Sequence, residues 1–512
     1  MTFNSIPFLI FYPVVLIGYL LTRVMPEKIG ANLRWIFLLA ASYFFYMYTQ
    51  PTLIVLILFT TLVSWICSLI IENINLRLAA GELSEDRIKS AERKKKLCLV
   101  LTLVTSLGVL FFFKYFNFLC ESVLGIAGAI SGESYNFALN LILPVGISFY
   151  TFQTLSYAID VYRGSIKTER HFGYYALFVS FFPQLVAGPI ERPDNLLPQL
   201  KQRLPISRED VAYGIRKMVL GFFKKIVVAD LISVYVNAIY NEVDTLETIP
   251  ALGVIIATAL FAVQIYCDFS GYTDIAIGCA RIMGIRLMKN FDHPYTAQTI
   301  KEFWNRWHLS LSTWFRDYLY FPLGGSRCAK WKHLRNIAIV FMVSGLWHGA
   351  AWTYVIWGAL HAGYQVVGTL TIKSRDNLIR KMGLKPNGLL VSNLRRVGTF
   401  LLVDFAWLFF RANTTGDMVK LLSALVSPKS WSIGWSESLD ILGLTASGIL
   451  LTILSIAVLY FVDRLVLHHE EKDGSRHLVA RGAIVTLVWI VAFAWTYLMA
   501  NDLTSTFIYF QF

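Results

Sequence analysis

Charge is what this sequence has least of. Only 15% of its 512 residues are Asp, Glu, Lys or Arg, whereas 56% are hydrophobic, and an ordinary soluble protein carries about 25% charged residues. Apolar runs recur from one end of the chain to the other, which excludes a soluble domain with a single anchor. The composition predicts an all-α polytopic membrane protein. In such a protein the net charge of +13 indicates cytoplasmic loops beside anionic lipid rather than nucleic-acid binding.

Several motifs of well-known chemistry are also missing. The six cysteines are scattered without a C-x-x-C pair, so neither a bound metal nor a disulfide framework is expected. No Walker A glycine loop and no dinucleotide fingerprint occurs, which removes support for ATP-driven transport and for dinucleotide redox chemistry. No G-x-S-x-G elbow occurs either, so a hydrolase with its own serine nucleophile loses support.

Basic residues near the N-terminus predict how the chain is oriented in the membrane. The first apolar span is expected to be retained, because it lacks the charged start and cleavage site of a signal peptide. Lys and Arg follow this span and crowd residues 72–96, whereas none precedes it. The positive-inside rule therefore places the N-terminus outside and residues 72–96 in the cytoplasm. We expect about ten to thirteen spans in all, among them residues 7–24, 33–48, 52–71, 97–116, 250–268, 397–410, 441–462 and 483–499.

Two apolar stretches contain residues that interrupt a helix. Residues 138–162 include a Pro-Val-Gly break at 144–146, and residues 174–193 include three prolines and a Gly-Pro pair. Proline inside a helix removes a backbone hydrogen bond and clashes with the preceding turn. Irregular backbone at membrane depth persists only inside protein or around a cavity, so residues 174–193 are expected to form a re-entrant or half-buried element. Residues 117–135 are expected at the outer surface.

Two polar stretches in the centre of the chain have helical spacing. Ser207 and Asp210 form a capping-box pattern that predicts the start of a basic amphipathic helix at the cytoplasmic membrane surface. Lys224 and Lys225 belong to the basic residues of that helix. Residues 284–327 contain aromatic residues at i, i+3 and i+4 steps. They predict a single helix with Trp304, Trp307, His308, Leu311, Phe315 and Tyr318 on one face.

Residues 336–365 are almost uninterruptedly apolar and contain no Lys, Arg, Asp or Glu. Because about 20 helical residues span the hydrocarbon core, this stretch is expected to lie in the membrane. His348 lies near its middle, and His361 lies near its end. An ionisable group at that depth is costly and is a functional candidate by default. The alternative for His348 is a packing histidine, and that role is expected for His361.

Two histidines near a membrane interior suit the transfer of an acyl group to a hydroxyl. A hydroxyl is a poor nucleophile at neutral pH, and a positioned histidine can remove its proton as it attacks a thioester carbonyl. His348 and His308 are the candidates for this chemistry. The residues alone leave a proton-coupled transporter equally open.

Four ordered blocks occur in the central part of the chain: PVGISFYTFQTLSYAIDVYRG at 144–164, FFPQLVAGPIERP at 181–193, the run from YCDFSGYTD to YLYFPLGG at 266–325, and VSGLWHGAAWTYVIWGALHAG at 343–363. These blocks resemble the membrane-bound O-acyltransferase family, in particular its bacterial polysaccharide-acylating branch. The C-terminal FIYFQF agrees with that branch, and none of the blocks departs from its pattern.

The resemblance implies a ring of tilted transmembrane helices with re-entrant segments, an extracellular funnel and a narrow cytoplasmic tunnel. The thin floor between them would let a charged donor stay inside while the acceptor stays outside. One domain would occupy residues 1–512, with a family-like core at about 140–370, helices at 1–137 before it and helices at 397–512 after it.

The resemblance also implies roles for individual residues. His348 of the WHG motif would be the catalytic base, and His308 of RWHLSLS would support it. Arg306, Trp307 and Arg316 are the candidate donor-binding residues, although arginines more often form salt bridges. Tyr509 in FIYFQF would accept the acyl group, with a packing tail as the alternative. No metal ligand and no permanently bound cofactor is implied.

The function expected from this resemblance is transfer of an acyl group, most simply acetyl from cytoplasmic acetyl-CoA, to hydroxyls of an extracytoplasmic polysaccharide. Transfer onto the sugar would be completed by an extracytoplasmic partner of the SGNH-hydrolase type. The protein would be a multi-pass protein of the bacterial cytoplasmic membrane, in contact with lipid and not with nucleic acid. A transporter or flippase for a lipid or glycan precursor, and a scaffold for a polysaccharide synthase, are the alternatives from other classes.

Overall fold

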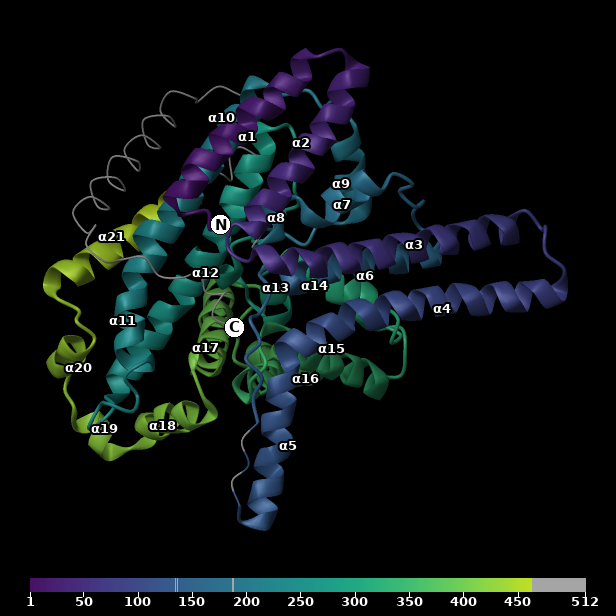
Figure 1. Cartoon of the computed structure of the whole chain (residues 1–512). Helices are drawn as coiled ribbons and strands as arrows, with labels where there is room; N and C mark the ends of the chain where they lie inside the picture. The colour runs from purple at the N-terminus through teal and green to yellow at the C-terminus, as the bar shows by residue number, and fades with distance from the viewer. Residues whose placement is uncertain (134, 136, 187, 463–512) are drawn as a thin grey trace. The chain divides into compact units, whose positions relative to one another are not determined.

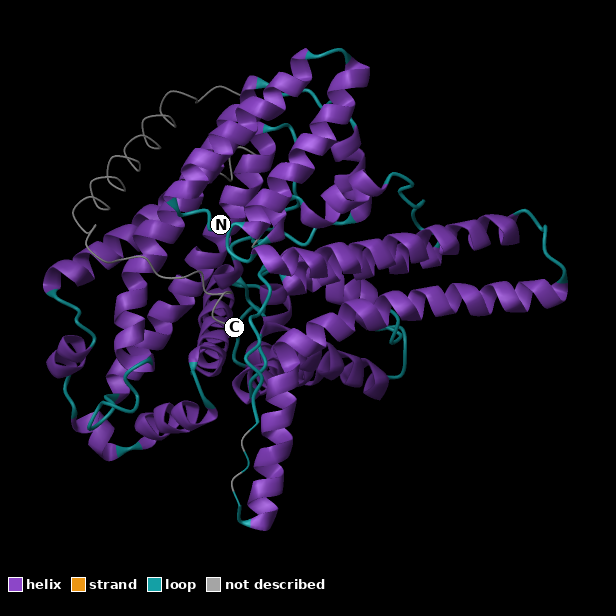
Figure 2. Ribbon diagram, viewed as in Figure 1, coloured by secondary structure: helices purple, strands orange, loops and turns teal. Residues whose placement is uncertain are grey.

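The structure is a computed structural model that describes residues 1–133, 135, 137–186 and 188–462. Within these residues every regular element is a helix and no strand occurs, which agrees with the all-α prediction (Figure 2). Two compact units divide the chain, and neither is continuous: Met1–Ile215 with Ala276–Met288, and Arg216–Ile275 with Lys289–Phe512. The single domain expected from the sequence stays a prediction. The predicted span at 483–499 and Tyr509 lie outside the described residues.

The first unit begins with helices close to those that the sequence predicts. They are α1 (Ile6–Val24), α2 (Glu27–Met47), α3 (Ile54–Ala79) and α4 (Glu85–Leu110). Helices α3 and α4 form a long antiparallel hairpin (Figure 1). The basic residues 87–96 belong to the start of α4, next to the turn of this hairpin.

Residues 117–135 are mostly helical, and their expected place at the outer surface stays a prediction. The π-helical η2 (Phe111–Tyr115) and α5 (Phe116–Ser131) continue α4, and Glu85–Ser131 is one helical stretch of 47 residues. The chain has no proline here, and the helix ends where Gly132 adopts the left-handed conformation with φ 78°. At 1.5 Å per residue the stretch measures about 70 Å, more than twice the hydrocarbon core, so only part of it can lie in the membrane.

The proline-rich apolar stretch is broken, as predicted. Short helices replace a straight span: α7 (Phe172–Ser180), α8 (Phe182–Leu185) and α9 (Pro193–Lys201). The apolar stretch 138–162 becomes helical only after its Pro-Val-Gly break, in α6 (Ile147–Arg163). Gly146 precedes α6 with φ 72°, and a Cβ there would lie 2.4 Å from the Leu185 carbonyl oxygen. A tight backbone contact therefore decides where α6 begins.

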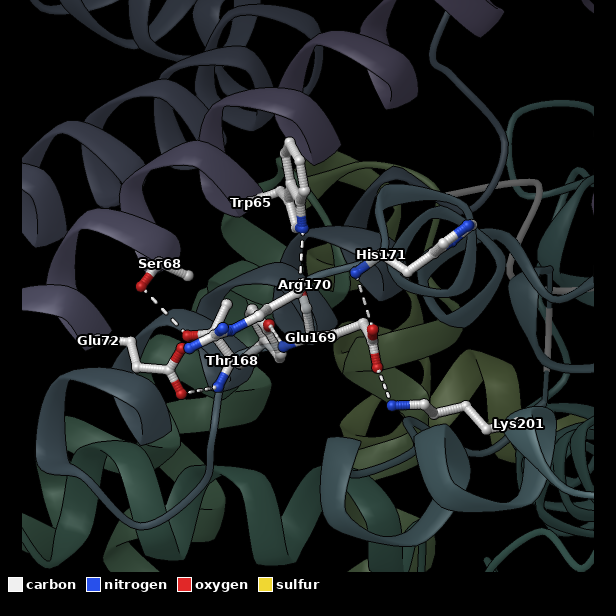
Figure 3. Close-up of polar contacts among 9 residues, drawn as sticks. Trp65, Ser68, Glu72, Thr168, Glu169, Arg170, His171 and Lys201 are labelled. Atoms are coloured by element: carbon white, nitrogen blue, oxygen red, sulfur yellow. Dashed lines mark hydrogen bonds and ion pairs between the residues drawn. The ribbon is translucent and has the colours of Figure 1, made fainter. Parts of the chain in front are cut away.

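Hydrogen bonds connect the loop between α6 and α7 to α3 and α9 (Figure 3). The Thr168 amide donates to the Glu72 carboxylate at 3.0 Å. The Trp65 indole donates to the Glu169 carbonyl at 2.8 Å. Lys201 from α9 donates to the Glu169 carboxylate at 2.6 Å. Because these contacts satisfy backbone groups as well as charges, the loop is held in one conformation.

Helix α10 (Arg208–Phe222) starts with the predicted capping box. The Asp210 amide donates to Ser207 Oγ at 3.0 Å, and the Ser207 amide donates to Asp210 Oδ2 at 3.2 Å. Burial opposes ionisation of Asp210, but the hydrogen bonds from Ser207 and the charges of Arg281 and Arg286 hold the pKa of Asp210 below its usual value. The capping carboxylate is therefore ionised at neutral pH.

The second unit holds the candidate site. Its long apolar helix is α12 (Ala251–Ile282), of which residues up to Ile275 belong to this unit. The other elements are η3 (Phe223–Ala229), α11 (Asp230–Tyr240), η4 (Pro294–Thr296), α13 (Ile300–Trp304), α14 (Leu309–Phe315), η5 (Arg316–Tyr320), α15 (Lys330–His348), α16 (Trp352–Lys381), α17 (Leu389–Arg411), α18 (Thr415–Val426), α19 (Pro428–Ser432), α20 (Trp435–Ile441) and α21 (Ala446–Val462).

Among the described residues, four helical stretches are long and apolar enough to cross a membrane: Ile6–Val24, Pro51–Ala79, Glu85–Ser131 and Ala251–Ile282. The pair α20 and α21, bent by 80°, makes a fifth if it counts as one span. Several apolar helices of this kind agree with a multi-pass membrane protein. The total of ten to thirteen spans stays a prediction.

Candidate active site

His308 stands at a break between two helices, so the single aromatic-faced helix predicted for this region is wrong. Helix α13 ends at Trp304, α14 begins at Leu309, and His308 between them is left-handed with φ 45°. Left-handed backbone is uncommon for residues other than glycine and interrupts a right-handed helix. Glu302 in α13 pairs with Arg306 in this break at 2.7 Å.

His348 is the last residue of α15, not the middle of a continuous span. Three residues separate it from α16, and the two helices pack against each other as a hairpin. Glycines make the close approach possible, because a Cβ on Gly345 would lie 2.4 Å from the Tyr354 carbonyl oxygen. A Cβ on Gly358 would lie 2.5 Å from the Phe341 carbonyl oxygen. The uncharged stretch 336–365 is therefore two helices with His348 at their turn.

The two candidate histidines flank one indole. The ring centroid of Trp347 lies 4.9 Å from that of His348 and 6.0 Å from that of His308. His348 also packs edge-on against Trp357 at 5.0 Å. Both histidines are buried, with 2% of His348 and 0% of His308 exposed. Residues 40 positions apart are thus brought into one aromatic site, as the acyl-transfer hypothesis requires.

His361 lies beside this site and has packing contacts. The indole of Trp304 donates a hydrogen bond from Nε1 to His361 Nδ1 at 3.2 Å. The ring of Trp357 lies between His361 and His348, at 4.9 Å from the His361 ring. These contacts agree with the packing role expected for His361.

Lys224 and Lys225 are buried, so their predicted place on the membrane surface is wrong. Lys225 contacts Asp268 at 2.7 Å and Asp230 at 2.8 Å, and Lys224 contacts Asp274 at 2.8 Å. Carboxylates on α12 and α11 compensate for the hydration that the buried ammonium groups lose. The sequence pattern of one helix cannot reveal such partners on other helices. The ion pairs join η3 to both of these helices.

The two candidate donor-binding arginines line different cavities. Arg306 lines a cavity of about 680 Å³ together with Arg396 and Tyr266. Arg316 lines a cavity of about 630 Å³ together with Lys301 and His333. Each arginine also contacts an acid, Glu302 and Asp317 respectively, as the salt-bridge alternative expected.

The Arg316 cavity approaches the histidine pair. Its lining includes Ser344, one helical turn before His348, and Leu309, the residue after His308. Trp307 lines neither cavity; it is 1% exposed and stacks on Phe303 with a centroid distance of 5.5 Å. Within the described part of the chain no group of three or more His, Cys, Asp or Glu residues could hold a metal ion.

The sequence did not point to Asn290 or Trp347 as parts of this site. Asn290 is buried and contacts His308 Nδ1 through Oδ1 at 3.1 Å. A polar residue eight positions past the end of α12 carries no recognisable spacing relative to His308. Trp347 is adjacent to His348 in the sequence, but its contact with His308 depends on how α14 and α15 meet.

The chain is similar to known proteins of one family. The family model described as MBOAT, membrane-bound O-acyltransferase family, matches residues 166–383, a range that includes His308, His348 and His361. The chain is 33% identical to the probable alginate O-acetylase AlgI of Pseudomonas putida, with 100% of both chains covered. It is 31% identical to the peptidoglycan O-acetyltransferase of Helicobacter pylori, over 81% of this chain and 78% of the relative.

A teichoic acid D-alanyltransferase of Bacillus subtilis is 35% identical over 44% of this chain and 58% of its own length. Acyl transfer is thus common to relatives that differ in the transferred group. Full-length coverage at 33% identity, together with the family match over the histidine region, leads to one conclusion. The chain belongs to the membrane-bound O-acyltransferase family and is a membrane O-acyltransferase.

Proposed function

We propose that this enzyme transfers an acetyl group from cytoplasmic acetyl-CoA toward hydroxyls of an extracytoplasmic polysaccharide. The observation that carries the proposal is the pair of buried histidines on either side of Trp347. The names of the relatives, alginate O-acetylase and peptidoglycan O-acetyltransferase, support the acetyl group and the polysaccharide acceptor.

His348 would act as the general base. It removes the proton of the acceptor hydroxyl while the hydroxyl oxygen attacks the thioester carbonyl and forms the new C–O bond. The C–S bond then breaks, and the CoA thiolate takes up the proton that His348 carries. The aromatic surroundings exclude water, which would otherwise compete with the acceptor.

The Arg316 cavity is the better candidate for the donor. Lys301, Arg316 and His333 provide basic groups for phosphates, and Ser344 and Leu309 bring the same cavity next to the histidines. Arg306 lines the other cavity, and neither Ser344 nor Leu309 contributes to the lining of that cavity. Trp307 would support the site by packing rather than by touching the donor.

The acceptor of the first transfer is either a sugar hydroxyl or the hydroxyl of Tyr509. In the second case Tyr509 would carry the acetyl group to an extracytoplasmic SGNH-type partner, which would complete transfer onto the polysaccharide. The enzyme would work in the bacterial cytoplasmic membrane, with its donor inside and its acceptor outside.

The test uses purified protein in nanodiscs and acetyl-CoA with a labelled acetyl group. CoA release and label on the protein are measured for wild type, His348→Ala and Tyr509→Phe. Loss of a general base lowers the rate by about 10²- to 10⁴-fold, so His348→Ala is expected to lose CoA release to that extent. His171→Ala, an exposed histidine in the first unit, serves as the matched control.

Each outcome separates the alternatives. Label on the Tyr509 peptide of the wild type, absent in Tyr509→Phe, supports the carrier step. CoA release that needs His348 but leaves Tyr509 unlabelled keeps the enzyme and discards the carrier. Function that survives in His348→Ala would contradict the proposal and favour the transporter or the scaffold.

A further inference from the structure

Asn290 is tied to the His308 turn through both its side chain and its backbone. It is 1% exposed and lies between α12 and η4. Its Oδ1 accepts hydrogen bonds from the Ser310 amide at 3.2 Å and from Ser310 Oγ at 2.9 Å. Its carbonyl oxygen accepts from the Leu309 amide at 2.8 Å. The same Oδ1 lies 3.1 Å from His308 Nδ1.

These contacts determine which nitrogen of a neutral His308 carries the proton. A backbone amide can only donate, so the atom that faces the Ser310 amide must be the amide oxygen of Asn290 and not its nitrogen. The Nδ2 group agrees with this, because it reaches Thr273 Oγ1 at 3.3 Å. An oxygen that faces His308 Nδ1 can only accept. Nδ1 therefore carries the hydrogen, and the lone pair is on Nε2.

We propose that Asn290 is the positioning residue of the site, and that it holds His308 as the Nδ1–H tautomer so that Nε2 accepts a hydrogen bond from the substrate, while His348 takes up the proton. The inference rests on the proposed acyl transfer and deepens it. Neutral His308 then accepts a hydrogen bond from a hydroxyl or amide N–H group of the acyl acceptor or of the acyl donor. It does not donate to the thioester carbonyl.

The backbone and the aromatic neighbours keep the ring in this orientation. His308 is left-handed with φ 45°, and the Leu309–Asn290 hydrogen bond holds the turn that contains it. The ring also packs edge-on against Phe269 at 4.6 Å and against Trp347 at 6.0 Å. A flip of the ring about the Cβ–Cγ bond would put Cδ2 in the place of Nδ1 and would lose the Asn290 contact.

His361 provides a contrast within the same unit. There the indole of Trp304, which can only donate, faces Nδ1, so the lone pair of His361 is on Nδ1 and the hydrogen is on Nε2. His308 and His361 are thus opposite tautomers, because His308 faces a hydrogen-bond acceptor and His361 faces a donor. Of these two, only His308 has an Nε2 that can accept a hydrogen bond.

The test compares Asn290→Asp, Asn290→Leu and the control Lys289→Gln. A carboxylate at 290 keeps the acceptor and stabilises the imidazolium, so Asn290→Asp is expected to move the acid limb of the kcat–pH profile upward by about one pH unit. Asn290→Leu removes the acceptor and is expected to lower kcat by about 10- to 100-fold with little change in KM. Lys289→Gln changes the net charge as Asn290→Asp does, but its side chain is about half exposed, 49%, and should leave the profile unchanged.

A spectroscopic measurement keeps the inference separate from the proposed function. ¹⁵N NMR of histidine-labelled wild type, with His308 assigned by its absence in His308→Ala, reports the tautomer without turnover. The Nδ1–H form is expected, and the Nε2–H form would overturn the inference. If the wild type shows no His348-dependent CoA release, the proposed function fails while the NMR result still decides the tautomer. An unshifted pH profile in a folded Asn290→Asp enzyme would overturn the positioning role alone.

Discussion

At the scale of single residues, the surroundings of each histidine decide its chemistry. His308 faces an amide oxygen, His361 faces an indole N–H, and His348 lies among aromatic rings. Buried polar groups need partners, and the identity of the partner selects the proton position. The same residue type therefore faces an acceptor in one place and a donor in another.

The two candidate donor arginines lead to a prediction at this scale. If acetyl-CoA occupies the Arg316 cavity, Arg316→Gln loses a charge-assisted contact with a phosphate. Such contacts contribute about 1.5 kcal/mol, so KM for acetyl-CoA is expected to rise about tenfold while kcat changes little. Steady-state kinetics with varied acetyl-CoA measure both constants.

Arg306→Gln is the matched control, because Arg306 lines the other cavity and pairs with Glu302. Arg306→Gln should change KM for acetyl-CoA by no more than about twofold relative to wild type, which corresponds to a binding free energy of only about 0.4 kcal/mol. A larger effect from Arg306→Gln than from Arg316→Gln would assign the donor to the Arg306 cavity instead.

At the scale of elements, the α15–α16 hairpin places His348 by a backbone contact. Gly345 and Gly358 face each other across the hairpin, and a Cβ on Gly358 would lie 3.2 Å from the Gly345 Cα. Small residues at such crossings let membrane helices approach closely. The turn of the hairpin then holds His348 against Trp357.

Gly358→Ala is expected to push these helices apart. Overpacking of this kind costs about 1–3 kcal/mol, so the melting temperature in detergent should fall, and activity should fall with it because His348 moves. Gly363→Ala, in the same helix, is the control, since a Cβ there meets nothing within 4 Å. Alanine is the better helix former by about 0.5–1 kcal/mol, so this variant should be at least as stable as wild type. Equal effects of the two changes would rule out the close contact.

At the scale of the whole molecule, charge distribution predicts the sidedness of the helices. The stretch Glu85–Ser131 starts in basic sequence and continues in apolar sequence. The positive-inside rule places its start in the cytoplasm and its end outside. Ser84 and Ser131 are exposed positions at these two ends.

Single cysteines at Ser84 and Ser131, in a variant without the six native cysteines, test this orientation. A membrane-impermeant thiol reagent added to intact cells should label Ser131→Cys and not Ser84→Cys. Inside-out vesicles should give the reverse pattern. Labelling of both positions from one side would contradict the orientation and would require this helix to lie on the membrane instead of crossing it.

Much of the molecule could be predicted from local sequence. The apolar N-terminal helices, the capping box at Ser207 and Asp210, and the break in residues 174–193 follow from hydropathy, side-chain capping and proline geometry, which act between near neighbours. The family resemblance identified His308 and His348 as candidate site residues. These features need no knowledge of distant contacts.

Other features depended on contacts that periodicity does not contain. Helical spacing predicted one helix through His308, but the bond between the Leu309 amide and the Asn290 carbonyl stabilises a left-handed turn there. Spacing likewise predicted that Lys224 and Lys225 are exposed. Both are buried, and aspartates on α12 compensate their charges.

The sequence by itself therefore determined that this is a helical membrane acyltransferase with two candidate histidines, because composition, charge and motif are local properties. Only the tertiary structure decided that His308 and His348 share Trp347, and that the two candidate donor-binding arginines line different cavities. It also decided that Asn290 sets the His308 tautomer. The physical reason is that hydrogen-bond direction and ring packing depend on atoms far apart in the chain, whose meeting only the folded backbone specifies.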